Sequence, residues 1–354
     1  MSRFFSERYS SLVPYTPGEQ PKNMEYVKLN TNESPYMPSN NVYDAVKKEA
    51  EKLHLYSDPQ ASIITEKIAK RYGVDKDMVL VTNGSDEVLN FAFMAYGDKE
   101  REMLFPNITY GFYTVFADLN GVKYREVPLK DDFTIDTSDY IGKNTTIVIA
   151  NPNAPTGIAL TRDQIEEIIK SNPNNVVIID EAYIDFGGES CVDLVHKYDN
   201  LLVTMTFSKS RSMAGARIGF GIGSKAIIND LNTIKYSTNP YNVNRISQVA
   251  GACAIDDDSY YMDNCKKIIE ARQYTKNELE KMGFFVLDSK ANFIFARSNK
   301  ISGEELYLKL KEKGVLVRHF TSEKIKDFNR ITIGTKEQMD IFLNKTREIL
   351  EATK

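Results

Sequence analysis

The chain has 354 residues, a net charge of −4 and 42% hydrophobic residues, which is an ordinary globular composition. Its 45 basic and 49 acidic side chains are well mixed, so the charge predicts no nucleic-acid partner and no anionic membrane surface. No apolar run approaches the roughly 18 residues that a membrane span needs, and the first residues lack the apolar stretch of a secretory signal. We therefore expect a cytoplasmic protein, long enough for two domains.

Cysteine and histidine are too sparse to predict a disulfide framework or a metal site. The three cysteines are irregularly spaced, as in proteins of a reducing compartment. The three histidines lack the spacing of metal ligands, so we expect no metal. These residues are Cys191, Cys253, Cys265, His54, His196 and His319.

Residues 1–40 are rich in Pro, Asn and Tyr and predict an irregular arm. From about residue 41, helical and strand patterns alternate. Apolar residues at helical spacing predict helices over 41–54, 61–72 and 162–171, and another that begins near Ser85. Apolar runs predict buried parallel strands at 78–82, 145–150, 176–180 and 201–206. This alternation is typical of an α/β domain, which we place at 41–245.

The pattern changes after about residue 245. A long helical stretch over 243–282 comes before a mixture of short strands and helices. The strands are expected at 284–287, 293–297, 315–317 and 330–333, and the helices at 302–313 and 336–351. We interpret 246–354 as a smaller α+β domain.

The first segment with chemical content is the predicted strand 176–180. It ends in Asp180, and Tyr183 follows three residues later. Ligands of open α/β sheets bind outside the carboxyl ends of the strands, which is where Asp180 would lie. Asp180 could equally cap a following helix.

The second segment, 206–220, follows another predicted strand and contains Lys209. A lysine after a strand is usually a solvated charge, but this one has unusual neighbours. The hydroxyls of Thr206 and Ser208 and the guanidinium of Arg217 are groups that bind phosphate. A lysine beside a phosphate pocket can form a Schiff base with an aldehyde cofactor.

The third segment, 82–87, predicts a strand, a turn at Gly84 and the start of a helix. The free backbone N–H groups of Ser85 and Asp86 could hold an anion at that helix end. In the alternative interpretation, Ser85 or Asp86 is an ordinary helix cap.

Together these segments resemble the fold-type I pyridoxal-phosphate enzymes, and among the class I and II aminotransferases they are most similar to the histidinol-phosphate aminotransferase family. The resemblance runs over nearly the whole chain. It implies a large domain with a mostly parallel seven-stranded sheet and helices on both faces, a small C-terminal α+β domain, and an arm that packs with the small domain or a dimer partner. Further segments that support it are 14–18, 28–36, 55–59, 151–157 and 330–334.

The resemblance implies a catalytic role for several residues. Lys209 would form the aldimine with pyridoxal 5′-phosphate and then move the proton at Cα. Asp180 would keep the pyridine nitrogen protonated, and Tyr183 would bond the 3′ oxygen of the cofactor. Tyr110 would stack on the ring, unless it is simply a core residue.

The resemblance also implies how the phosphate is held, and that the enzyme is a homodimer with shared sites. A tyrosine at the position of Tyr56 would reach the phosphate from the neighbouring subunit. The phosphate ligands from the same chain would be Gly84, Ser85, Asp86, Thr206, Ser208 and Arg217.

For the substrate, Arg330 would bind the carboxylate of an amino donor, and Tyr15 and Arg318 would add to the pocket. One position departs from the family. Ala154 stands where an asparagine usually bonds the 3′ oxygen, so Asn153 or Asn151 would have to supply the amide, or the bond is absent.

Four functions stay open on the sequence. The first is transfer of the amino group between L-histidinol phosphate and 2-oxoglutarate, in histidine biosynthesis. An aromatic aminotransferase and a threonine-phosphate decarboxylase would share these motifs. The Gly-rich string at 219–223 raises a nucleotide-binding alternative, although it lacks the third glycine spacing of a dinucleotide site.

Overall fold

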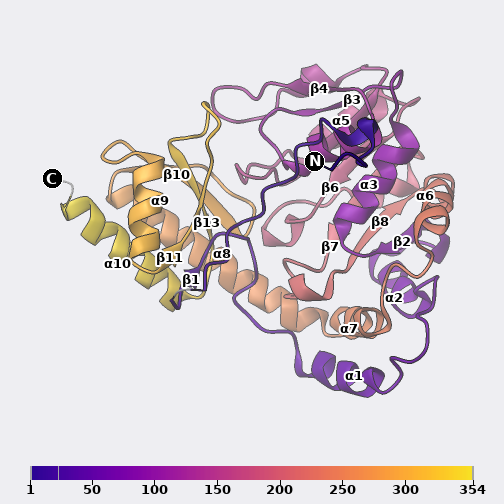
Figure 1. The fold of residues 1–354 in the computed structure, drawn as a ribbon, viewed down its shortest axis with the longest axis horizontal. Coiled ribbons are helices and arrows are strands. Elements are labelled where there is room, and N and C mark those ends of the chain that lie inside the picture. Colours follow the sequence, from indigo (N-terminus) through magenta and orange to yellow (C-terminus); the bar gives the residue numbers. More distant parts are fainter. Residues whose placement is uncertain (1, 23, 353–354) are drawn as a thin grey trace.

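A seven-stranded sheet forms the centre of the larger part of the molecule (Figure 1). The computed structural model describes residues 2–22 and 24–352. The strand order is β2-β8-β7-β6-β5-β3-β4, with β8 antiparallel to both neighbours and the other pairs parallel. This confirms the predicted, mostly parallel sheet. The strands are β2 (Val79–Thr82), β3 (Met103–Pro106), β4 (Tyr124–Val127), β5 (Thr146–Ala150), β6 (Val177–Asp180), β7 (Leu201–Thr206) and β8 (Gly219–Gly223).

Helices cover both faces of this sheet because successive side chains of a buried strand point to opposite sides. In β5, Ile147 and Ile149 belong to the hydrophobic cluster that includes residues of α2, α5 and α7, whereas Val148 belongs to the cluster with residues of α3, α4 and α6. This explains why the strands are apolar throughout. The helices of this part are α1 (Asn40–Ala50), α2 (Ser62–Tyr72), α3 (Ser85–Tyr96), α4 (Phe112–Asn120), α5 (Arg162–Ser171), α6 (Lys225–Thr238) and α7 (Arg245–Asp256).

The smaller part contains a four-stranded antiparallel sheet of order β12-β13-β10-β9. Three helices pack with it in a second core. The elements are β9 (Phe284–Val286), β10 (Phe293–Ser298), β12 (Arg318–His319), β13 (Phe328–Thr332), α8 (Asp258–Lys281), α9 (Gly303–Glu312) and α10 (Lys336–Ala352).

The predicted helical stretch over 243–282 forms two helices. It is divided into α7 and α8 at Asp257, whose backbone leaves the helical region with ψ at 29°. The Asp257 carboxylate accepts hydrogen bonds from Ser39 and Asn41, at the start of α1. Figure 1 shows α8 as the long helix that runs from beside α7 to the C-terminal elements. It contributes Tyr261 to the larger core and Cys265 to the smaller one, so the change of core lies within this helix.

The N-terminal arm joins the smaller part through a short strand. β1 (Val27–Lys28) pairs in parallel with β11 (Val315–Leu316), which belongs to the segment predicted as one strand at 315–317. Leu29 packs into the smaller core, and Leu29 O accepts from Thr332 N at 2.9 Å. The arm then crosses to α1, so residues 29–36 run between the two parts (Figure 1).

Within residues 2–22 and 24–352, no helix is long and apolar enough to cross a membrane. In the same residues, no cluster of three or more His, Cys, Asp or Glu side chains could hold a metal ion.

Candidate active site

A cavity of about 260 Å³ lies at the carboxyl ends of β5, β6 and β7, between the sheet and the arm. Asp180 and Thr206, the last residues of β6 and β7, line it together with Thr31 of the arm. The geometry therefore agrees with the general position of ligands in open α/β sheets. Nine of the predicted site residues line it: Ser85, Asp86, Tyr110, Asp180, Tyr183, Thr206, Ser208, Lys209 and Arg217.

Lys209 lies where this cavity meets a second one of about 440 Å³. Its Nζ donates to Thr31 O at 3.4 Å, which is long for a hydrogen bond. The same Nζ lies 5.7 Å from the centre of the Tyr183 ring. The amine thus has one long hydrogen bond, and Lys209 lines both cavities.

Asp180 is almost fully buried, and two hydroxyl groups hold its carboxylate. Tyr113 on α4 and Thr204 on β7 each donate to it at 3.1 Å. Burial raises the pKa of Asp180 to about 6, although these two hydrogen bonds oppose the rise. A buried carboxylate of this kind gains most from a cationic partner.

The start of α3 has a geometry that could hold an anion. Gly84 turns the chain there with φ at 91°, and no side chain caps the helix, so its first N–H groups are free to bind an anion. A Cβ at Gly84 would lie 2.6 Å from Arg217 Nη2, so only glycine lets the guanidinium come this close.

Arg217 joins the turn to the segment that follows β7. Its Nη1 donates to Ser208 Oγ at 3.4 Å, and its Nη2 lies 3.3 Å from Asp86 Oδ2. Ser208 Oγ in turn accepts from Thr206 Oγ1 at 3.0 Å. Two hydroxyls, a guanidinium and a helix N-terminus therefore converge, which is a donor set that suits a phosphate group.

Two tyrosines form walls shared by both cavities. The Tyr110 hydroxyl donates to Asp86 Oδ1 at 2.8 Å, and burial raises the pKa of Tyr110 well above its usual value. Because the Tyr110 ring lines both cavities, its position fits stacking on a ligand better than core packing alone. The hydroxyl of Tyr183 accepts from Asn32 Nδ2 at 2.9 Å.

The second cavity brings Arg330, Arg318 and Tyr15 together. Arg330 and Arg318 are direct partners across β13 and β12. Arg330 Nη2 donates to Asn30 O at 3.0 Å, and its buried Nε has no hydrogen-bond partner among the described residues. Burial lowers the pKa of Arg330. An unsatisfied buried donor beside a second guanidinium suits an anionic substrate.

Two predicted residues lie elsewhere. Asn153 does not line the first cavity, because its amide donates to Ile108 O and Thr156 and accepts from Thr109. Tyr56 is 81% exposed and stacks on Tyr241 with ring centres 4.8 Å apart.

Comparison with known proteins decides the family. The class I and II aminotransferases match residues 24–345. The chain belongs to this family. It is 52% identical over 353 residues to the histidinol-phosphate aminotransferase of Brachyspira hyodysenteriae, covering 99% of this chain and 100% of that protein. It is 46% identical over 351 residues to the one of Clostridium beijerinckii, covering 99% and 98%.

A solved structure shows the same fold at lower identity. The histidinol-phosphate aminotransferase of Sinorhizobium meliloti, in complex with pyridoxal-5′-phosphate, has a TM-score of 0.91 and is 20% identical. The similarity covers 100% of this aminotransferase and 99% of that chain.

The Gly-rich string of the aminotransferase does not form a nucleotide-binding loop. Residues Gly219–Gly223 are the buried strand β8, between β2 and β7. A Cβ on Gly219 would lie 2.1 Å from Ser85 N, so this glycine lets β8 approach the anion-binding turn.

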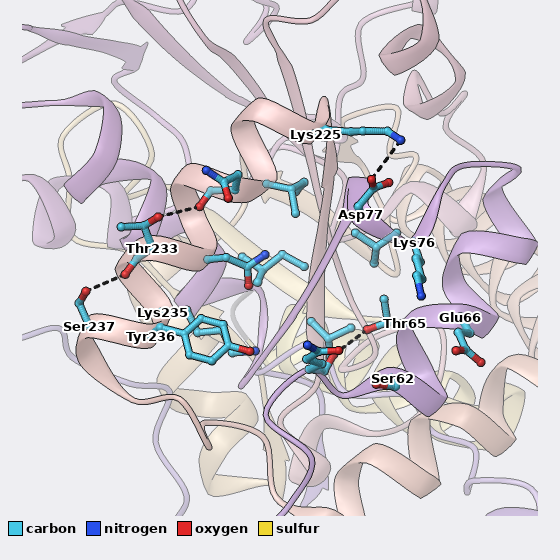
Figure 2. A pocket seen from close by; sticks show the side chains of 17 residues that line it. Ser62, Thr65, Glu66, Lys76, Asp77, Lys225, Thr233, Lys235, Tyr236 and Ser237 are labelled. Atoms are coloured by element: carbon cyan, nitrogen blue, oxygen red, sulfur yellow. Dashed lines mark hydrogen bonds and ion pairs between the residues drawn. The ribbon is translucent and has the colours of Figure 1, made fainter.

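Another cavity, of about 860 Å³, is lined by residues outside the candidate active site of the aminotransferase (Figure 2). It lies at the outer edge of the sheet, between α2, α6 and β2. Lys225 forms ion pairs with Asp75 and Asp77 there. None of the predicted site residues lines this cavity.

Sequence reasoning missed Tyr113, Thr204 and Asn32. Thr204 pairs with Asp180 in the parallel register of β6 and β7, so knowledge of that register would have found it. Tyr113 looks like an ordinary apolar position of α4. Asn32 is separated from Tyr183 by 151 residues, and no local pattern connects them.

Proposed function

We propose that this aminotransferase transfers the amino group between L-histidinol phosphate and 2-oxoglutarate, a step of histidine biosynthesis, with pyridoxal 5′-phosphate as its cofactor. The observation that carries the proposal is the 52% identity over the full length of a histidinol-phosphate aminotransferase. The site is compatible with it, because Lys209 lies between an anion-binding cavity and one with two arginines.

The residues of the first cavity fit this cofactor. The phosphate would be held at the start of α3 by Ser85, Ser208 and Arg217. The buried carboxylate of Asp180 would pair with the protonated ring nitrogen, and the Tyr183 hydroxyl would bond the 3′ oxygen. When bound, pyridoxal phosphate supplies an aldehyde for the amine and a ring that accepts electrons.

Lys209 would hold the cofactor covalently and then move the proton. Since Lys209 lines both cavities, its free amine can take a proton from the substrate Cα and pass it to the cofactor carbon. The single long bond to Thr31 O costs little to break when the amine moves.

The paired arginines would bind the acidic groups of the two substrates in turn. Arg330 and Arg318 lie side by side on β13 and β12 and line the second cavity. A phosphate and a carboxylate both suit guanidinium donors. Histidinol phosphate and 2-oxoglutarate could therefore share this cavity.

A homodimer would complete the phosphate site. Tyr56 is 81% exposed and lines neither cavity of its own chain. Its stacking on Tyr241 forms an exposed aromatic surface, as expected of side chains that meet a partner. We infer that the hydroxyl of Tyr56 reaches the phosphate of the other subunit.

The cytoplasm is our proposal for the location of the enzyme. Cys191, Cys253 and Cys265 are all free, which agrees with a reducing compartment. Cell fractionation with an antibody against the protein tests it.

A half-reaction tests the substrate. Protein loaded with pyridoxal phosphate is mixed with histidinol phosphate, and absorbance follows conversion to the pyridoxamine form. Fast conversion, reversed by 2-oxoglutarate, is expected. Faster conversion with aromatic amino acids, or carbon dioxide release from phosphothreonine, would instead move the assignment to the aromatic aminotransferase or the decarboxylase.

A further inference from the structure

Asn32 occupies an unusual position between the two parts of the molecule. It is 1% exposed and has a positive φ of 56°, a conformation that asparagine tolerates better than most residues. Its Nδ2 donates to the Tyr183 hydroxyl at 2.9 Å, and its Oδ1 accepts from Thr332 Oγ1 at 3.0 Å. Asn292 Nδ2 donates to its backbone oxygen at 3.0 Å.

The hydrogen bonds determine which group donates and which accepts between Thr332, Asn32 and Tyr183. Thr332 Oγ1 accepts from the backbone N–H of Asn32 at 2.9 Å, so its own proton points to Asn32 Oδ1. The amide is then oriented, with its NH₂ toward Tyr183. Because Nδ2 can only donate, the Tyr183 oxygen must accept from it. The proton of Tyr183 is left to point elsewhere.

The Tyr183 side chain borders both cavities of the candidate site. Its ring packs edge-on with Phe293, with ring centres 5.1 Å apart. Ala154, which lines the same cavities, offers no side-chain donor. The amides of Asn151 and Asn153 are bonded to Leu160, Ile108 and Thr156 instead.

We propose that Asn32 is a positioning residue that makes the Tyr183 hydroxyl a donor to the 3′ oxygen of the cofactor. This rests on the pyridoxal phosphate of the proposed function, but not on which amine is the substrate. Asn32 itself touches neither substrate nor cofactor. Asn32 is hydrogen-bonded to Thr332 and Asn292. The direction in which the Tyr183 hydroxyl donates therefore depends on the smaller part of the molecule.

The proposal predicts a spectroscopic effect with a definite sign. Loss of the proton from the cofactor–Lys209 linkage leaves the negative charge of the 3′ oxygen unbalanced. A donor to that oxygen favours this deprotonated form and lowers the pH of the absorbance transition. Removing this donor should therefore raise the pH of the absorbance transition. Lys209 lies near the Tyr183 ring, and Arg330, Tyr110 and Tyr113 interact with Tyr183 electrostatically; none of the variants below changes these four residues.

The decisive variant is Asn32→Asp, whose carboxylate oxygen would accept the Tyr183 proton and turn it away from the cavity. We expect the absorbance transition to rise by about one pH unit and the affinity for pyridoxal phosphate to fall about tenfold. Because the new charge acts on the cofactor directly, the same substitution is repeated in a Tyr183→Phe background. There the shift should be clearly smaller, and the difference measures the action through the hydroxyl.

Three further variants separate positioning from folding. Asn32→Gly fits the positive φ and should raise the transition less than Asn32→Asp does. Thr332→Val should also raise it, since the amide loses its fixed orientation. Thr346→Val is its matched control: Thr346 is as buried as Thr332, but its hydroxyl bonds Phe342 O on α10, so only the melting temperature should fall.

Equal shifts from Asn32→Asp with and without the Tyr183 hydroxyl would overturn the proposal. So would an unchanged transition in Asn32→Gly and Thr332→Val. These measurements need no amino donor, so a protein that rejects histidinol phosphate can still confirm the role of Asn32. An unaltered protein that gives no cofactor absorbance would overturn both proposals.

Discussion

The two cavities that share Lys209 are built in different ways. In the first, polar side chains of the sheet and of α4 bond one another, as Asp180 does with Thr204 and Tyr113. In the second, the guanidinium of Arg330 is held by a backbone oxygen of the arm, Asn30 O. Arg318 likewise donates to Thr16 O and Pro17 O, at 3.3 and 3.4 Å. The sheet thus preforms the first cavity, whereas the second depends on where the arm lies.

If this contrast is correct, substitutions in the first cavity should lower the rate of amino transfer, and substitutions in the second should mainly weaken substrate binding. The largest effect is expected at the shared residue. Lys209→Ala should lower amino transfer by at least about 10³-fold, since both the covalent link and the proton transfer are lost. Single-turnover absorbance measures this.

The Lys209→Ala variant should keep the stability of the unaltered protein, because the one bond of Nζ to Thr31 O is long. Thermal unfolding without cofactor is the control. Amino transfer at nearly the normal rate would show that another group carries the proton.

Asp180→Asn comes next. Removing one partner of a buried ion pair costs about 3–5 kcal/mol, so turnover should fall by roughly 10²–10⁴-fold. The KM for the amino donor should change far less, because the carboxylate lies on the cofactor side. Steady-state kinetics separates the two parameters, and a rise in KM alone would break the comparison.

Without cofactor, Asp180→Asn should instead be favourable, because it should raise the free energy of unfolding at neutral pH. Burial raises the pKa of Asp180 from 3.8 to about 6, so this group costs stability as the pH rises through that range. Asparagine cannot ionise. Between about pH 4 and pH 8, the free energy of unfolding should shift by about 2–3 kcal/mol in favour of Asp180→Asn. Urea unfolding at both pH values measures it, and a pH-independent difference would contradict the cause.

In the second cavity, Arg330→Gln should lower kcat/KM by about 10²-fold, mostly through KM, because its Nε is buried and unsatisfied without a ligand. Arg318→Gln should lower it only about two- to fivefold, since the partly exposed guanidinium is screened by water. Cofactor affinity should stay normal in both. Equal losses in the two variants would show that the arginines act as one site.

A small effect is also expected from Tyr56→Phe, which removes a hydroxyl from a side chain that is 81% exposed in one chain. In the dimer it should weaken cofactor binding by about three- to tenfold. Titration with pyridoxal phosphate measures this, and size-exclusion chromatography with light scattering checks the dimer. A dimer with unaltered affinity would remove Tyr56 from the phosphate site.

The sequence predicted the part of the site that local pattern determines. Asp180, Thr206 and Lys209 follow apolar strands, and strand ends of a parallel sheet meet at one edge. Gly84 and Ser85 mark a helix start that any reader of turn signals can find. The partners of these residues were not predictable, because Tyr113 and Asn32 reach the site only through tertiary packing.

The same distinction holds for the fold. The strands β2, β5, β6 and β7 of the larger part were predicted within a residue or two, whereas β3, β4 and β8 were not predicted; in β8 the alternate residues are glycines. The helical pattern over 243–282 continues without interruption in the sequence. Its break at Asp257 is stabilised by Ser39 and Asn41, more than 200 residues away, so only the folded chain shows it.

The glycines of β8 also limit how the enzyme can be redesigned. Gly219 sets the spacing between β8 and Ser85, and Arg217 lies two residues before it. Any side chain at 219 would push the start of α3 outward and separate the anion-binding N–H groups from the guanidinium. Attempts to widen the pocket for a bulkier cofactor analogue should therefore begin at Tyr110 or Ala154, whose side chains form its walls, and leave β8 untouched.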